Sequence, residues 1–599
     1  MIGFLDTIKR EWIYITNVRK ALKRAAMYQP DDPVGLADVL EDKFDKHKAN
    51  IAIRFEDKIY TYRELEERAN QYAHWAINQG FKAGDTVALF MDNKPDYIAF
   101  WVGMSKVGIV TALINNQLQG AGLAHCVSIS NARAIVMGPE QEELYASAKE
   151  QLGEDIVPWS LDCTLAGVSS IDPLLADLPV TRPERSHRAE IRGRDTCLYV
   201  YTSGTTGLPK AAKLTQVRVL GMLGAFVDSV GITERDRIYV TLPLYHATGG
   251  LCGVGQALTT GATLILARKF SASNFWDDAV KHKATSFAYI GELCRYLVKT
   301  DPHPLERQHT IRKGFGNGLR AEVWEKFVER FNIPHLVEFY GSTEGNVSFS
   351  NFDGKIGAVG RLPSYMRDKI KTRIVKFDIA EEKPIRGDDG FCIETDIDEA
   401  GEAIGEIADA PRQRFDGYHD PKQTEKKILR DVFVPGDMWF RTGDLMKRDE
   451  HDYIYFVDRI GDTFRWKGEN VSTNEVGEAL SSFDDLELPN VYGVAMPETD
   501  GRAGMAGVNL KPGRSFDGKA LAAHVDQQLP VYARPIFIRI QPEPETTGTL
   551  KYRKVDLVKQ GYDISQIDDP VYVRLPGSDT YEPLTAEIVD DINSGKVRF

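Results

Sequence analysis

Short runs rich in β-branched and aromatic residues alternate with longer helical patterns over most of the first 350 residues. The strand-like run Thr86–Phe90 follows the helical pattern Tyr62–Gln79, and Ala134–Met137 follows Asp96–Lys106. Strands that alternate with helices are joined by crossovers, which produce parallel sheets covered by helices. The alternation recurs at four further runs: Cys197–Tyr201, Arg237–Leu242, Thr263–Ala267 and Ser286–Ile290. The sequence therefore predicts a large α/β body.

The sequence pattern changes twice after this body. Between about Gly354 and Asp444, short strands are separated by acidic and glycine-rich turns, which is typical of a small β subdomain. After Val457–Asp462 the pattern returns to mixed α/β. A chain of 599 residues also exceeds the size of one hydrophobic core. We therefore predict an N-terminal segment, residues 1–35, a large domain, residues 36–458, and a smaller C-terminal domain, residues 459–599.

The composition is that of an ordinary globular protein, with 42% hydrophobic and 27% charged residues. The formal net charge of -13 offers no electrostatic basis for binding nucleic acid, so no such partner is expected. The six cysteines form no C-x-x-C pair, which argues against a zinc site and a disulfide framework. These features favour a reducing compartment and a cytoplasmic protein.

The first 25 residues combine apolar side chains such as Phe4 and Trp12 with six lysines and arginines. They lack the continuous apolar core of a signal peptide, so secretion is not expected. Two interpretations stay open. This segment is either a helix that lies on a membrane surface, which would make the protein peripheral, or a helix that packs on the body.

The strongest single motif is the run at residues 201–210, which directly follows an apolar strand-like run. Its hydroxyls, glycines and lysine suit polyphosphate oxygens, because glycine permits close approach of backbone N–H groups. The Walker A spacing is absent, so a P-loop enzyme is excluded. A hydroxyl-rich surface turn is the alternative. The predicted nucleotide contacts are Tyr201, Thr202, Ser203, Gly204, Thr205, Thr206, Gly207 and Lys210.

Two later runs add an aromatic face, a carboxylate and a glycine-rich strand end. In Phe339–Gly345, Tyr340 can stack on adenine, Thr343 can bond a phosphate oxygen, and Glu344 can hold Mg²⁺, which prefers carboxylate and phosphate oxygens. In Gly314–Gly318 the glycines let the backbone pass flat against a base. The predicted contacts from these runs are Gly316, Asn317, Gly318, Tyr340, Gly341, Thr343 and Glu344.

The three runs, in this order and spacing, resemble the adenylate-forming superfamily of acyl-CoA synthetases, adenylation domains and luciferases. By that resemblance Asp444 is the ribose-binding aspartate and Arg459 a second ribose contact. The run Asp458–Val471 resembles the signature of the very-long-chain acyl-CoA synthetases, also called fatty acid transport proteins. The resemblance implies an α/β fold with a large AMP-binding body of two α/β subdomains plus a small β subdomain, followed by a small mobile α+β lid.

The same resemblance implies an acid–thiol ligase that uses ATP, Mg²⁺ and coenzyme A to convert a long- or very-long-chain fatty acid to its acyl-CoA, through an acyl adenylate. Lys210, Thr206 and Glu344 would serve adenylation, with Thr206 and Glu344 at the metal. Lys467 would serve thioester formation after the lid rotates near Gly461. Coupling to fatty acid uptake, branched or bile acid substrates and the oligomeric state stay open.

Two positions depart from the family pattern or carry an alternative. The superfamily's adenylation lysine usually follows Thr/Ser-Gly directly, whereas here Lys551 lies two residues further on. On an extended strand Lys551 shares a side with Thr549 and can reach the site, and a solvated lysine is the alternative. The predicted acyl-pocket residues are Tyr245, His246 and Thr248. For His246 a buried, hydrogen-bonded histidine is the alternative.

Two other functions are open at this stage. An adenylation enzyme could hand its acyl group to a carrier protein, although no fused carrier domain follows in the sequence. A lipid-uptake protein could retain a vestigial adenylation site. The displaced Lys551 favours that second alternative, whereas the intact Glu344, Asp444 and Arg459 argue against it.

Overall fold

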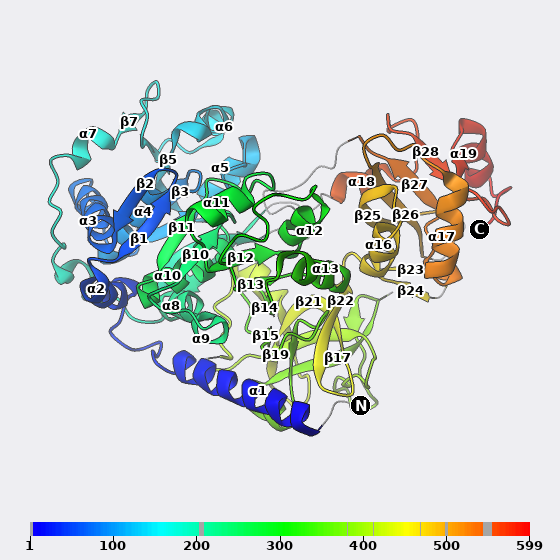
Figure 1. Ribbon diagram of the computed structural model, residues 1–599, viewed down its shortest axis with the longest axis horizontal. Helices are drawn as coiled ribbons and strands as arrows, with labels where there is room; N and C mark the ends of the chain where they lie inside the picture. Colours follow the sequence, from blue (N-terminus) through cyan, green and yellow to red (C-terminus); the bar gives the residue numbers. More distant parts are fainter. Residues whose placement is uncertain are drawn as a thin grey trace. The chain divides into compact units, whose positions relative to one another are not determined.

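The computed structural model describes residues 4–202, 209–379, 381–410, 412–467, 469–497, 501–542 and 554–599. The chain divides into two compact units (Figure 1). Unit 1 contains residues 1–362 and 406–429, and unit 2 contains residues 363–405 and 430–599. The chain therefore leaves unit 1 after residue 362, returns to it at residue 406, and leaves it again after residue 429.

The first sheet of unit 1 has the strand order β7-β6-β5-β3-β4-β8-β9. Its strands run parallel except for the last pair, β8 and β9, which form an antiparallel hairpin. Three central strands are entirely or almost entirely buried, as expected for a sheet covered on both faces. The bounds are β3 Thr86–Phe90, β4 Val110–Leu113, β5 Ala132–Met137, β6 Val157–Ser160, β7 Ser169–Ser170, β8 Thr196–Thr202 and β9 Lys210–Thr215.

The second sheet of unit 1 has the order β15-β14-β13-β12-β10-β11-β1-β2. Its six inner strands are parallel, and the edge strands β15 and β2 are antiparallel to their neighbours. The bounds are β1 Ile51–Phe55, β2 Lys58–Thr61, β10 Arg237–Val240, β11 Thr263–Leu266, β12 Ser286–Ile290, β13 Lys313–Asn317, β14 His335–Gly341 and β15 Ser348–Asn351. The α/β body predicted from the sequence is confirmed.

Helices connect these strands and cover the sheets, and one large apolar core extends through both α/β layers. A smaller cluster fills the other side of the first sheet. The helices of unit 1 are α1 Phe4–Ala25, α2 Leu36–His47, α3 Tyr62–Asn78, α4 Pro95–Lys106, α5 Gly120–Ile129, α6 Glu142–Ala148, α7 Asp172–Leu175, α8 Gln216–Gly224, α9 Val227–Val230, α10 Val254–Thr260, α11 Phe275–Lys281, α12 Gly291–Lys299, α13 Ala321–Phe331 and α15 Pro421–Glu425.

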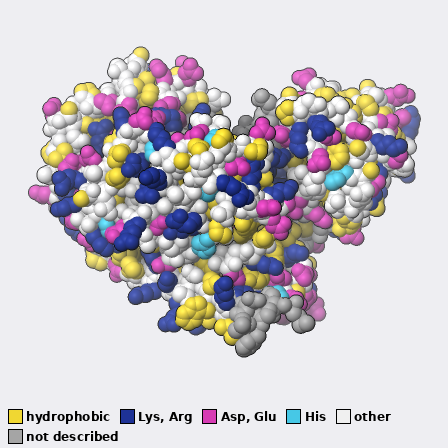
Figure 2. Space-filling model, viewed as in Figure 1, with side chains coloured by type: hydrophobic (Ala, Val, Ile, Leu, Met, Phe, Trp, Pro, Cys, Tyr) yellow, Lys and Arg dark blue, Asp and Glu magenta, His cyan; other side chains and the backbone are white. Residues whose placement is uncertain are grey.

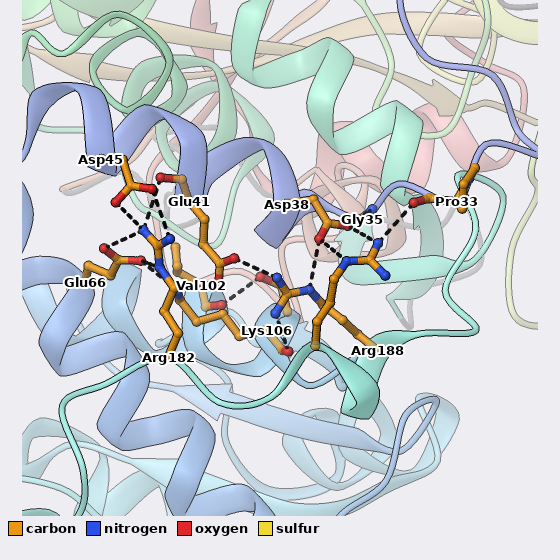
Figure 3. A network of polar contacts seen from close by, with 12 residues as sticks. Pro33, Gly35, Asp38, Glu41, Asp45, Glu66, Val102, Lys106, Arg182 and Arg188 are labelled. Atoms are coloured by element: carbon orange, nitrogen blue, oxygen red, sulfur yellow. Dashed lines mark hydrogen bonds and ion pairs between the residues drawn. The ribbon is translucent and has the colours of Figure 1, made fainter.

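A buried ion network fastens the segment before β8 to helices α2, α3 and α4 (Figure 3). Lys106 is fully buried, and its Nζ lies 2.8 Å from Glu41 and 2.9 Å from Glu66. Arg188 binds Glu41 at 2.7 Å, and Arg182 binds Glu66 at 2.7 Å. Removing one partner would leave a buried charge uncompensated, which typically costs about 3–5 kcal/mol. The network therefore fixes the segment that leads into β8.

Helix α1 lies on unit 1 with one face buried. Tyr14 and Val18 are 4% and 6% exposed, and the Tyr14 ring lies 6.2 Å from the ring of Phe352. The Arg361 guanidinium stacks over Tyr14 at 5.5 Å and binds Glu11. Figure 1 shows α1 beside α9, which it contacts. Of the two interpretations left open for the N-terminal segment, packing on the body describes this face, whereas the other face of α1 is exposed.

Unit 2 contains an antiparallel sheet and a C-terminal α+β layer. The first has the order β22-β21-β19-β17-β18, and the second β25-β26-β27-β28-β29. The C-terminal layer has a hydrophobic core of its own, drawn from residues 464–592. The strands are β17 Thr372–Asp378, β18 Lys383–Pro384, β19 Gly401–Glu406, β21 Met438–Arg448, β22 Tyr453–Arg459, β23 Phe464–Trp466, β24 Glu469–Val471, β25 Leu486–Ala495, β26 Arg502–Leu510, β27 Phe537–Ile540, β28 Val571–Val573 and β29 Glu582–Pro583. The helices are α14 Arg367–Ile370, α16 Thr473–Ser481, α17 Gly518–Gln528, α18 Val555–Gln560 and α19 Ala586–Asn593.

The predicted limits at residues 35 and 458 stay predictions. Throughout the part of the chain that the structure describes, every helix is too short or too polar to cross a bilayer.

Candidate functional site

The predicted phosphate loop connects β8 to β9. Thr202 and Lys210 face each other in the hairpin register, so the two ends of the loop are held together. The Tyr201 hydroxyl donates to the Cys126 carbonyl at 2.6 Å, which anchors the end of β8. The loop positions Ser203, Gly204, Thr205, Thr206 and Gly207 lie outside the described residues. Their predicted contacts stay predictions.

Glu344 and Lys210 are neighbours because both contact the side chain of Tyr418. The Tyr418 hydroxyl donates to Glu344 Oε1 at 2.6 Å, and Lys210 Nζ lies 5.5 Å from the centroid of the Tyr418 ring. Glu344 is only 8% exposed. Burial lowers the pKa of Lys210, and the nearby charges of Lys427 and Lys426 lower it further. The structure therefore brings together a cation and a carboxylate whose positions in the sequence are 134 residues apart.

A half-buried arginine holds the segment that carries Glu344 in place. Arg218, on α8, donates to the carbonyl of Gly345 at 2.5 Å and to that of Thr343 at 2.8 Å. Burial lowers the pKa of Arg218, and the carboxylates of Asp416 and Glu344 oppose that shift. Arg218 therefore connects α8 to the segment that follows β14. No local sequence pattern marks Arg218.

The glycine-rich strand end forms a flat wall. A Cβ on Gly316 would lie 2.2 Å from the Tyr289 carbonyl oxygen, and Gly318 has a φ of +78°, so both positions require glycine. Asn317 Oδ1 is buried and has no hydrogen-bond partner among the described residues. Tyr340 lies on the neighbouring strand β14, which ends at Gly341. A carboxamide beside a flat wall and an aromatic ring suits a purine base.

The predicted ribose contacts stand opposite each other in unit 2. Asp444 and Arg459 are register partners in the β21–β22 hairpin, and Arg459 Nε lies 3.8 Å from Asp444 Oδ1. Asp444 is 17% exposed and Arg459 52% exposed. A carboxylate held beside a guanidinium can accept from two vicinal hydroxyls. Their role stays a prediction.

Comparison with known proteins assigns the chain to a family. Residues 40–390 match the family model described as AMP-binding enzyme. Long-chain fatty acid transport protein 6 of Mus musculus is 40% identical over 98% of this chain and 95% of that protein. Long-chain fatty acid transport protein 2 of Rattus norvegicus is 40% identical over 90% of this chain and 87% of that protein. The chain belongs to the long-chain fatty acid transport protein family of AMP-binding enzymes.

The fold agrees with this membership of the fatty acid transport protein family. The crystal structure of the anthranilate CoA ligase AuaEII has a TM-score of 0.76 to this chain at 20% identity, covering 91% of this chain and 100% of that one. The family, the adenylate-forming fold and the enzyme class predicted from the sequence are thereby confirmed.

The predicted acyl-pocket residues of this fatty acid transport protein family member lie immediately before and within an unusual helix. Tyr245 is buried, and its ring centroid lies 4.4 Å from that of His246. Residues Ala247–Gly253, which include Thr248, form a π-helix. A Cβ on Gly250 would lie 1.8 Å from the Leu244 carbonyl oxygen, so the turn packs backbone against backbone. Such π-helices are frequent at functional sites.

Of the two lysines predicted to act from the C-terminal domain, Lys467 lies among the described residues and Lys551 does not. Lys467 has a φ of +52°, and its Nζ lies 5.9 Å from the Trp466 ring centroid. Lys551 lies outside the described residues. Lys554, three positions later, bonds the Thr473 hydroxyl at 3.1 Å and lies 3.2 Å from Asp462. Lys554 therefore connects the segment after Lys551 to the predicted hinge, a contact that sequence reasoning missed.

Sequence reasoning also missed the buried carboxyl group of Glu338, which lies behind the glycine wall. Glu338 Oε2 accepts from the Tyr289 hydroxyl at 2.9 Å, and Oε1 accepts from the Leu319 N–H at 3.0 Å. Glu338 is 2% exposed. Burial raises the pKa of Glu338 to about 8, although these two hydrogen bonds oppose the shift. Glu338 thus fixes the turn after Gly318 at a cost in electrostatic free energy.

Replacing Glu338 by Gln should make stability less dependent on pH between about 5 and 8. The folded-state pKa lies above the ordinary value of 4.5, so the folded protein binds more protons than the unfolded chain in this window. Stability therefore falls as pH rises through it, by about 1.4 kcal/mol per unit of pKa difference at most. Thermal unfolding of both proteins near pH 6 and pH 8 measures this. Parallel pH profiles would contradict the expectation.

Proposed function

We propose that this protein is a long- or very-long-chain fatty acyl-CoA synthetase, which joins a fatty acid to coenzyme A at the expense of ATP. The observation that carries the proposal is the juxtaposition of Lys210, Tyr418 and Glu344 at 5.5 and 2.6 Å, beside the glycine wall of an AMP-binding enzyme. The names of the relatives refer to long-chain fatty acids, which supports the substrate class.

The first half-reaction activates the carboxylate. A carboxylate oxygen attacks the α-phosphorus of ATP, the new P–O bond forms, and the bond to the leaving pyrophosphate breaks. Little covalent chemistry falls to the protein, so positioning and charge neutralisation dominate catalysis. The Lys210 ammonium would bind the polyphosphate, and the hydroxyls of Thr205 and Thr206 would donate to it. The buried Asn317 carboxamide and Tyr340 would hold the base.

The donor set of this site fits Mg²⁺. No group of three or more His, Cys, Asp or Glu residues capable of holding a metal occurs in the described part of the chain. Mg²⁺ usually binds one or two carboxylates together with substrate phosphates, and Glu344 is such a carboxylate. Glu344, with the Thr206 hydroxyl, would hold the metal, which would neutralise charge on the phosphates. Lys210, whose ammonium lies over the Tyr418 ring, would share that task.

The second half-reaction transfers the acyl group. The coenzyme A sulfur attacks the acyl carbon, the bond to the phosphate oxygen breaks, and AMP leaves while the thiol proton passes to solvent. We propose that residues 459–599 form a lid whose rotation near Gly461 exchanges Lys551 for Lys467 at the reaction centre. Asp444 and Arg459 would hold the ribose.

The decisive experiment measures both products from purified full-length protein. Pyrophosphate and acyl-CoA are quantified with ATP, Mg²⁺, coenzyme A and fatty acids of graded chain length, with branched and bile acids included. We expect both products, with a dependence on chain length that defines the substrate. Pyrophosphate without thioester would indicate another acceptor, such as a carrier protein. Absence of both products from folded protein would favour a lipid-uptake protein with a vestigial site.

We further propose that the exposed face of α1 lies on an anionic membrane surface. Ile8, Trp12 and Ile15 follow helical spacing and are 51%, 72% and 43% exposed. Lys9, Lys20, Arg19 and Lys23 are exposed on the same helix. Figure 2 shows basic and hydrophobic side chains together along the lower edge, where Figure 1 places α1. Helices of this kind bind membranes through apolar insertion and attraction to anionic lipids.

Replacing Ile8, Trp12 and Ile15 by Ser should reduce vesicle binding by about tenfold or more, because each buried apolar side chain contributes roughly 1.5 kcal/mol or more. The measurement is co-sedimentation with phosphatidylcholine vesicles with and without phosphatidylserine. The matched control replaces three similarly exposed residues elsewhere, Ile59, Val180 and Val531, which are 50%, 46% and 74% exposed. Equal pelleting of the α1 variant and the unmodified protein would exclude this membrane face.

A further inference from the structure

Tyr418 contacts both of the charged groups on which the proposed adenylation depends. Its hydroxyl donates to Glu344 at 2.6 Å, and the Lys210 ammonium lies over its ring, 5.5 Å from the centroid. Tyr418 is 4% exposed, so this side chain is part of the packed interior of unit 1. A hydroxyl bonded to a buried carboxylate, with a cation over the same ring, is a specific arrangement rather than a surface contact.

The segment that carries Tyr418 is fixed to the phosphate hairpin. Tyr418 pairs with Ala212 on β9, because the His419 N–H donates to the Ala211 carbonyl at 3.0 Å and the Lys213 N–H donates to the Gly417 carbonyl at 3.2 Å. The position of Tyr418 is therefore set by the strand that begins at Lys210.

A sharp turn aims the ring of Tyr418 toward the site. Gly417 has a φ of +73°, and a Cβ there would lie 2.7 Å from Thr424 Cγ2. The Thr424 hydroxyl accepts from the Tyr418 N–H at 2.9 Å. These contacts fix the backbone at Tyr418, while its hydroxyl contacts Glu344 and its ring lies beneath the Lys210 ammonium.

The hydroxyl of Tyr418 bonds a charged group, because its partner is the Glu344 carboxylate. Hydrogen bonds to charged groups contribute more than neutral ones, about 1.5–3 kcal/mol, and one that fixes a metal ligand also fixes its geometry.

We propose that Tyr418 is a positioning residue, which orients the Glu344 carboxylate for the divalent cation and seats the Lys210 ammonium for the polyphosphate. The kinetic consequence of this inference rests on the proposed function. The inference adds Tyr418, which reaches the site from residues 406–429. Tyr418 acts through Glu344 and Lys210, so it is not itself a group that touches the reacting atoms.

The test replaces Tyr418 by Phe, which removes the hydroxyl and keeps the ring. In ATP–pyrophosphate exchange we expect kcat to fall about 10- to 100-fold and the half-saturating Mg²⁺ concentration to rise about tenfold, from the loss of one charge-assisted hydrogen bond. The KM for the fatty acid should stay unchanged. Tyr418→Leu also removes the ring from Lys210, so it should further raise the KM for ATP by a few-fold.

A second readout does not depend on turnover. Binding of Mn²⁺ together with a non-hydrolysable ATP analogue, followed by electron paramagnetic resonance, should weaken about tenfold in Tyr418→Phe. The matched control is Tyr239→Phe, which removes a buried tyrosine hydroxyl that donates to a carboxylate, Asp278, at 3.0 Å elsewhere in unit 1. It should leave Mn²⁺ binding and kinetics unchanged.

The outcomes separate the inference from the proposed function. Unchanged Mn²⁺ affinity and Mg²⁺ dependence in Tyr418→Phe would overturn the inference even if the protein makes acyl-CoA. The same holds if Mn²⁺ binding falls only in proportion to a loss of folded protein, judged by thermal unfolding beside the Tyr239→Phe control. If the unmodified protein forms no acyl-CoA, the Mn²⁺ measurement still decides the role of Tyr418.

Discussion

Lys210→Ala should reduce the rate of ATP-dependent acyl-CoA formation by at least about 100- to 1,000-fold, the usual cost of removing one preorganised group that stabilises transition-state charge. Lys210 begins β9 and pairs with Thr202 at the end of β8, with its ammonium over the Tyr418 ring. Alanine would leave the developing pyrophosphate charge without this cation. The measurement is kcat for pyrophosphate release and for acyl-CoA formation, with ATP, Mg²⁺ and the preferred fatty acid.

Lys213→Ala is the matched control for this prediction. Lys213 lies on the same strand, three positions from Lys210, so its side chain leaves the opposite face of β9. This variant should retain turnover close to that of the unmodified protein. Turnover in Lys210→Ala equal to that of Lys213→Ala would refute the role of Lys210 and, with it, the assignment of the phosphate site.

Glu344→Gln should be nearly as damaging, with a loss of about 100-fold or more in the adenylation half-reaction. Glutamine keeps an oxygen that can accept from the Tyr418 hydroxyl, so the local fold should persist. It removes the negative charge that Mg²⁺ needs. ATP–pyrophosphate exchange at graded Mg²⁺ concentrations separates weaker metal binding from slower chemistry, because excess Mg²⁺ would restore only the former.

The control for the carboxylate is Asp278→Asn, which makes the same chemical change at a carboxylate bonded by Tyr239. Exchange in this variant should match the unmodified protein. Glu344→Gln with normal exchange at low Mg²⁺ would show that the metal is held elsewhere.

Much of the fold could be predicted because its elements carry their own local signals. The predicted runs Thr86–Phe90 and Ser286–Ile290 coincide with β3 and β12. Buried parallel strands are uninterrupted apolar runs, so each is visible without knowledge of its neighbours. The π-helix after His246 was not predictable, because it arises from backbone packing of Gly250 against Leu244 rather than from a change in hydrophobic period.

The site could be predicted only where its residues belong to contiguous motifs. Lys210 and Glu344 stand in dense runs of glycines, hydroxyls and charges, and such runs are recognisable in isolation. Arg218, Glu338 and Tyr418 stand in ordinary helix, strand and turn sequence. Their importance comes from contacts across 125, 19 and 74 residues of chain, to Thr343, Leu319 and Glu344 respectively. No local pattern encodes such a contact.

The return of residues 406–429 to unit 1 restricts how this enzyme can be cut or recombined. A recombinant fragment that follows the AMP-binding family model, residues 40–390, would include Lys210 and Glu344 and yet lack Tyr418. Its soluble expression would not report on the intact enzyme. Chimeras with relatives should therefore place their crossover after residue 429. A protease cut between residues 363 and 405 would generate two pieces that both contribute to unit 1, so the nicked protein should lose activity only when the pieces separate.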